Sequence, residues 1–206
     1  MKKIIAFLTS ILILGSVTAQ DADMVFTSNS ITWFGLDYSE AYFIGTEGFT
    51  NPDDIKSRYF DSWNNLVLQE SDKFDIGKFF YKDEVENDLS VVSKRNAGVD
   101  IKSRVINDPS EAVPLDENKV RKMINEYEFE GNPEGLGLVF IVESYDKNST
   151  TGTYYVTFFN ISTREALLIK RMEGKAKGFG LRNFWAASYY AVMKSANKMY
   201  EKWENE

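Results

Sequence analysis

The chain has 206 residues, 31 acidic and 24 basic, which gives a formal net charge of −7, and it contains neither cysteine nor histidine. The absent residues exclude disulfides, thiolate catalysis, the usual serine triads and most zinc sites, so we expect no metal and no cofactor. An acidic surface repels nucleic-acid phosphates, so we also expect no nucleic-acid partner.

Residues 1–19 have the pattern of a secretory signal peptide. Two lysines precede an apolar stretch at residues 4–14, and small residues end the segment at Ala19. As a helix the apolar stretch is about 16 Å long, too short for a hydrocarbon core of about 30 Å. We predict cleavage after Ala19, which leaves a periplasmic or secreted protein, residues 20–206, with no membrane span. A chain without cysteine has no lipoprotein acylation site there.

The first half of this region is predicted to alternate strands and helices. Residues 31–38 are rich in β-forming residues and predict a buried strand, which residues 41–45 extend or follow with a second edge. Asn51 and Pro52 are typical of a helix start, and the apolar spacing predicts a helix over residues 51–70. We then expect a strand at 76–81, a helix at 83–96 and a strand at 99–106.

The second half is predicted to end in a meander and a long helix. A connector at 108–114 leads to a helix at 115–127, and hairpin-sized loops then separate three strands at 136–145, 153–160 and 166–173. Apolar residues at helical spacing predict a closing helix at 181–203. The absence of a linker indicates one domain over residues 20–206. The expected fold is α/β (α+β): a mixed sheet with a C-terminal three-strand antiparallel meander and helices packed against it.

The sequence "YYVTFFNISTREALL" and the long helix after it resemble a group of bacterial envelope proteins. The group includes the curli-secretion lipoprotein, the outer-membrane activators of penicillin-binding proteins, and the N-terminal domain of TolB. The resemblance covers residues 134–200 and departs from the family pattern at Asn160, where an aspartate is expected, and at Arg164-Glu165, where Gly-Glu is expected. It implies an accessory or binding role in the cell envelope, without the lipid anchor common in that group.

The segment "GKAKGFGLRNFW", residues 174–185, is the candidate ligand- or partner-binding site. Glycines beside a helix N-terminus let a backbone approach an anion, and neighbouring cations add charge, which singles out Lys175, Lys177, Gly178, Gly180 and Arg182. The spacing matches neither of the known nucleotide-binding loops. In the alternative interpretation the glycines only make a turn, the lysines are solvated, and three aromatic residues pack on the sheet: Phe179, Phe184 and Trp185.

Several carboxylate pairs are available for acid–base chemistry. Three of them, Asp53-Asp54, Asp83-Glu84 and Asp116-Glu117, are placed where a helix first turn favours negative charge, which is the simpler interpretation. Glu84 and Glu86 form a fourth pair. The loop with Asp146 and Asn148 faintly resembles a calcium loop but lacks its glycine and last acidic residue, so we predict a hairpin turn.

These observations favour a non-catalytic binding or accessory protein of the bacterial cell envelope with an unidentified envelope protein as partner. The alternative is a carboxylate-based hydrolase that acts on a glycan, because such an enzyme needs no histidine. The sequence leaves open the oligomeric state, the identity of the partner, and the choice between periplasm and extracellular space.

Overall fold

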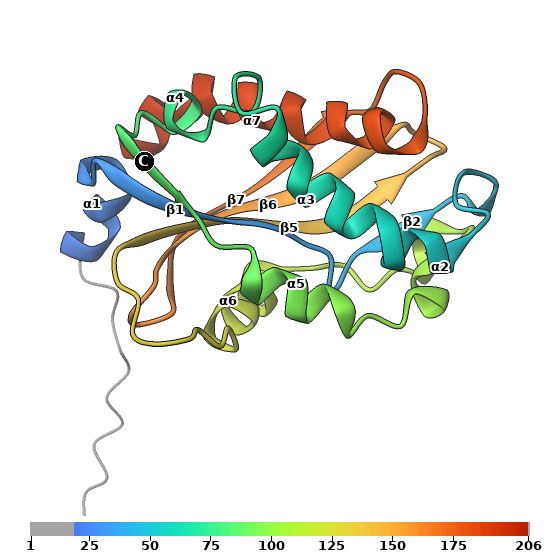
Figure 1. The fold of residues 1–206 in the computed structure, drawn as a ribbon, viewed down its shortest axis with the longest axis horizontal. Coiled ribbons are helices and arrows are strands. Elements are labelled where there is room, and N and C mark those ends of the chain that lie inside the picture. The colour runs from blue at the N-terminus through green and yellow to red at the C-terminus, as the bar shows by residue number, and fades with distance from the viewer. Residues whose placement is uncertain (1–18, 206) are drawn as a thin grey trace, which may run out of the picture.

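The computed structural model describes residues 19–205 (Figure 1). The predicted signal peptide ends at Ala19, so all of it except that residue lies outside the described residues. The described chain begins with a short helix, α1 (Ala19–Thr27). No helix in the described part of the chain is long and apolar enough to cross a membrane.

A seven-stranded mixed sheet forms the middle layer, with β5 (Leu136–Asp146) at its centre. One edge of β5 pairs with two parallel strands in succession, β1 (Ser30–Asp37) and β2 (Tyr42–Ile44). Two short strands extend the sheet in parallel, β3 (Glu84–Asn87) beside β1 and β4 (Val105–Ile106) beside β2. The other edge of β5 begins the antiparallel meander with β6 (Thr151–Asn160) and β7 (Glu165–Lys175).

Helices cover both faces of this sheet (Figure 1). One face carries α3 (Phe60–Gln69), α4 (Ile76–Phe80) and α7 (Leu181–Glu204), and the other carries α5 (Ser90–Ala97) and α6 (Glu117–Asn125). Side chains of β5 alternate between the two resulting cores, with Phe140 in the first and Ile141 in the second. A strand that is buried on both faces has apolar residues at consecutive positions, which explains the nearly continuous apolar sequence of β5.

The predicted fold class is confirmed, and the C-terminal elements match their predicted ranges closely. The three meander strands and α7 form at the positions that the hairpin-sized loops and the helical spacing of apolar residues predicted. Asn51 caps α2 (Pro52–Asp54) as expected, because its side chain accepts from the N–H of Asp54 at 3.4 Å. A π-helical turn, Ile55–Tyr59, continues α2 into α3.

Between residues 76 and 106 three predicted elements are wrong. The strand expected at 76–81 is helix α4, whose N-terminus is capped by Asp75 through a hydrogen bond from the Lys78 N–H at 2.9 Å. The helix expected at 83–96 is β3 followed by the shorter α5, and the strand expected at 99–106 is a 3-10 turn, Ile101–Arg104, followed by two-residue β4. Short apolar runs are compatible with either a helix or a strand, and their tertiary surroundings decide which of the two forms.

The meander and α7 approach each other at Gly174 in β7. A Cβ atom at this position would overlap the backbone oxygen of Ser188, so only glycine allows the helix to pack this closely. Gly152 in β6 pairs with Gly174 across the sheet and lies under the Ser188 side chain. This contact sets where α7 lies on the sheet and therefore where its N-terminal loop projects.

Candidate functional site

The candidate segment 174–185 runs from the end of β7, through an exposed loop, into the first turn of α7. The loop is closed by two backbone hydrogen bonds at Phe184, whose C=O accepts from the Lys177 N–H at 3.2 Å and whose N–H donates to the Gly180 C=O at 2.9 Å. Gly178 and Gly180 have φ angles of 105° and 74°. Both angles lie in the left-handed region that glycine adopts without strain, so the two glycines determine the path of the loop.

Phe179, between these glycines, is 95% exposed. The expectation that Phe179 packs on the sheet is therefore wrong, because the two left-handed glycines turn this residue away from the core. The expectation is confirmed for Trp185, which is fully buried and stacks on Tyr145 with ring centroids 4.4 Å apart. Phe184 is half-buried and lies under the ammonium group of Lys147.

The three cations of the segment have different surroundings. Lys175 is part of the neighbouring hairpin, since its ammonium group donates to the Ser149 C=O at 3.1 Å and to the Thr151 hydroxyl at 2.9 Å. Arg182 is half-buried, and its Nε donates to the Asn183 side chain at 3.2 Å. Lys177 is exposed on the loop. Lys177 and Arg182 are thus the two cations of the segment that can meet a partner.

A groove of about 320 Å³ lies beside the loop, between residues 179–183 and the helix that begins at Asn51. That helix contributes Arg58 and Tyr59, and Trp63 of α3 fixes the two segments together by donating from Nε1 to the Arg182 C=O at 3.0 Å. Sequence reasoning missed Arg58, because no local pattern connects residues so far apart in the chain. We call this groove, together with the exposed Lys177 of the same loop, the Phe179 surface and define it by five residues: Arg58, Tyr59, Lys177, Phe179 and Arg182.

The predicted carboxylate pairs mostly have structural partners. Asp116 caps α6 by accepting from the Lys119 N–H at 2.7 Å, and Asp53 lies in the first turn of α2, 3.3 Å from the ammonium group of Lys102. The helix-start interpretation is wrong for Asp83 and Glu84, because β3 begins at Glu84 and Asp83 lies immediately before it. These placements give the hydrolase hypothesis no support.

The loop with Asp146 and Asn148 is the β5–β6 hairpin turn, as predicted. The carboxylate of Asp146 accepts from the Asn148 N–H at 2.9 Å and from the Ser149 hydroxyl at 2.7 Å, so it is occupied by the turn itself. Within residues 19–205, no group of three or more acidic side chains is arranged to hold a metal ion.

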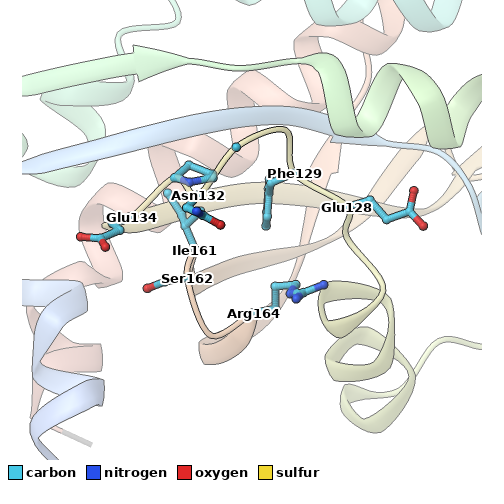
Figure 2. Close-up of a pocket in the computed structure, with 9 residues that line it drawn as sticks. Glu128, Phe129, Asn132, Glu134, Ile161, Ser162 and Arg164 are labelled. Carbon is cyan, nitrogen blue, oxygen red and sulfur yellow. The ribbon is translucent and has the colours of Figure 1, made fainter.

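A second cavity, of about 310 Å³, lies between residues 128–134 and the β6–β7 turn (Figure 2). Its two carboxylates, Glu128 and Glu134, point outward at opposite ends of the cavity. Glu128 pairs with Lys94 at 2.6 Å, and this hydrogen bond lowers the pKa of the Glu128 carboxyl group. A general acid needs a raised pKa and a carboxylate partner across the substrate, so this cavity does not resemble a glycosidase centre.

The fold defines the class of the protein as α/β, with a meander and one long helix closing the sheet. Comparison with known proteins finds no family model, no curated protein and no solved structure that matches the chain. The assignment of a function therefore depends on the chain's own surfaces.

Proposed function

We propose that this protein is an exported, non-catalytic binding protein of the bacterial cell envelope, and that it captures a protein partner through the Phe179 surface. The single observation that carries the proposal is the 95% exposure of Phe179. A ring so exposed contributes almost nothing to the chain's own core, and aromatic residues are enriched at the centres of protein interfaces.

The distribution of charge supports a partner with an acidic surface around an apolar pocket. The whole chain has a net charge of −7, yet Arg58 and Arg182 line the groove beside Phe179, and Lys177 is exposed on the same loop. An acidic partner is attracted to this region and repelled by the rest of the molecule, which orients the encounter. The resemblance of residues 134–200 to envelope accessory proteins supports the same class of function, and the signal-peptide pattern supports the compartment.

The test is capture of a partner from an envelope extract of the native host by the immobilised mature protein, followed by binding measurements with the purified partner. We expect Phe179→Ala to abolish capture, because the ring is the anchor of the contact. The matched control is Val113→Ala, which shortens an apolar side chain that is 60% exposed in the connector before α6. Capture should also weaken with salt, since the screening length falls from about 10 Å at 0.1 M to about 3 Å at 1 M.

Equal capture by wild type, Phe179→Ala and Lys177→Gln would contradict the proposal. Binding of the wild type to vesicles of anionic phospholipid, lost in Phe179→Ala and without any protein partner, would instead identify the Phe179 surface as a lipid-binding site and would also contradict it.

A further inference from the structure

A second cluster of charged side chains lies at the carboxyl end of β1, away from the loop before α7. The last residue of β1 and the segment after it contribute to the cluster, together with the helix α5, the 3-10 turn Ile101–Arg104 and the helix α6. In sheets with parallel strands, ligands bind beyond the carboxyl ends of the strands, where loops diverge. The members of the cluster are Asp37, Glu40, Arg95, Arg104 and Lys119.

Asp37 is the buried anchor of this cluster, with its side chain fully excluded from solvent. Its carboxylate accepts hydrogen bonds from Arg95 Nε at 3.0 Å, from the Tyr127 hydroxyl at 2.9 Å and from the Ser39 N–H at 2.8 Å. The Arg95 guanidinium also lies over the Tyr127 ring, 5.3 Å from its centroid. A buried carboxylate with these three donors holds Arg95 in one orientation.

Glu40 is shared by two cations. Its carboxylate accepts from Arg104 Nη2 at 3.0 Å and from the Lys119 ammonium group at 2.8 Å. Partial burial raises the pKa of the Glu40 carboxyl group, but the hydrogen bonds from Lys119 and Arg104 outweigh burial and the net shift is downward. Glu40 is therefore ionised at neutral pH. Counted together with the nearby Asp100 carboxylate, the three cations of this region are balanced by three carboxylates.

A cavity of about 330 Å³ opens beside this cluster, and Arg95 and Arg104 both line it. The side chains of Arg95 and Arg104 are only 21% and 22% exposed, so each is partly dehydrated and fixed in place. Ser39 also lines the cavity, and its hydroxyl oxygen accepts from Arg95 Nη2 at 3.2 Å, which leaves the hydroxyl hydrogen free to donate. Arg95, Arg104 and Ser39 thus line one space with side chains that can donate hydrogen bonds.

We propose that this cavity binds a small molecule through a carboxylate or phosphate group, with Arg95, Arg104 and Ser39 as the donors. Guanidinium groups held in one orientation match the paired oxygens of either anion. Asp100 and Ser103 line the same cavity and supply acceptors for a hydroxyl or amino group of that molecule. The Ser103 hydroxyl donates to the Asp100 C=O at 2.8 Å, which leaves the lone pairs of its oxygen available as acceptors. This proposal is independent of the Phe179 surface.

The test is an NMR titration of the mature protein with inorganic phosphate and, separately, with lactate, each at constant ionic strength maintained with potassium chloride. We expect saturable shifts of the Arg95 and Arg104 Nε–H signals with at least one of the two anions. In Arg104→Gln, Lys119 still pairs with Glu40, so the fold is retained while the anion affinity falls about tenfold or more, the usual effect of losing a charged donor pair. Ser39→Ala should weaken the same binding and serves as the second variant if Arg104→Gln is unfolded.

The matched control is Arg58→Gln, which removes one positive charge from the other basic groove and should leave the titration unchanged. Absence of saturable shifts with both anions would overturn the proposal. It would also be overturned if both site variants bound like the wild type, or if Arg58→Gln weakened binding as much as Arg104→Gln, because the effect would then be one of overall charge.

Discussion

The side chain of Asn64 forms two hydrogen bonds with the backbone of Leu36, accepting from its N–H at 2.6 Å and donating to its C=O at 3.1 Å. Leu36 lies near the end of β1, beyond the last residue pair of β1 with β3. The buried amide of Asn64 therefore takes the place of a neighbouring strand. Asn96 of α5 also takes the place of strand partners, because its side chain donates to the same C=O of Leu36 and accepts from the Tyr38 N–H.

We expect Asn64→Ala to lower the free energy of unfolding by about 1–3 kcal/mol, because the buried N–H of Leu36 loses its acceptor. The C=O of Leu36 keeps its hydrogen bond from Asn96. The loss of stability is therefore smaller than if both backbone groups of Leu36 lost their partners. Urea unfolding measures the change. The control is Asn125→Ala at the exposed end of α6, which should stay within about 0.5 kcal/mol of wild type. Equal effects of the two variants would contradict the strand-replacing role of Asn64.

Gly174→Ala should destabilise the protein by about 1–3 kcal/mol or more, because the added methyl group meets the backbone oxygen of Ser188 and α7 must move off the sheet. Thermal unfolding measures the loss. The comparison variant is Gly98→Ala at the end of α5, where φ is −79° and the nearest atom would be 3.3 Å away. If Gly174→Ala melted like wild type, the close packing of α7 on β7 would be wrong.

Lys82 should make stability rise with pH between about 8 and 10.5. Its ammonium group is buried where it donates to the C=O groups of Val25 and Ser28, at 2.7 Å and 2.6 Å, at the end of α1, and burial lowers the pKa of Lys82 from 10.5 to about 8. In that interval the unfolded chain still holds the proton that the folded chain has released, so each rise in pH favours the folded state.

The measurement is the difference in unfolding free energy between wild type and Lys82→Gln at pH 7 and at pH 9.5. Tyrosine ionisation, which occurs in both proteins, cancels from the difference. We expect the unfolding free energy of wild type to increase relative to that of Lys82→Gln as the pH rises. If this difference in unfolding free energy stayed constant or fell as the pH rose, folding would not lower the pKa of Lys82.

Two aromatic residues six positions apart should respond oppositely to truncation. Trp185→Ala should cost about 3–5 kcal/mol, because the fully buried ring packs between Tyr145 and Phe49. Phe179→Ala should leave the melting temperature nearly unchanged, because the residue is 95% exposed. Differential scanning calorimetry of both variants checks this pair, and a large loss for Phe179→Ala would mean that its loop folds back onto the protein.

The sequence by itself determined the elements whose signals are local. The β5–β6–β7 meander follows from hairpin-sized loops between strand-forming runs, and α7 follows from apolar residues recurring at helical spacing. The Asn51 cap follows from residue types that act within one turn. Each of these features depends on residues close together in the chain, so the pattern of residue types was sufficient.

Only the tertiary structure decided the region between residues 76 and 106 and the composition of the two candidate sites. The segment that forms α4 is short and apolar, and its state depends on the sheet and α7, against which it packs. Arg58 lines the same groove as Phe179, and Arg95 pairs with Asp37, although the residues of each pair are distant in the chain. Such pairs form because packed layers bring distant segments together, and no local pattern of residue types encodes which segments will meet.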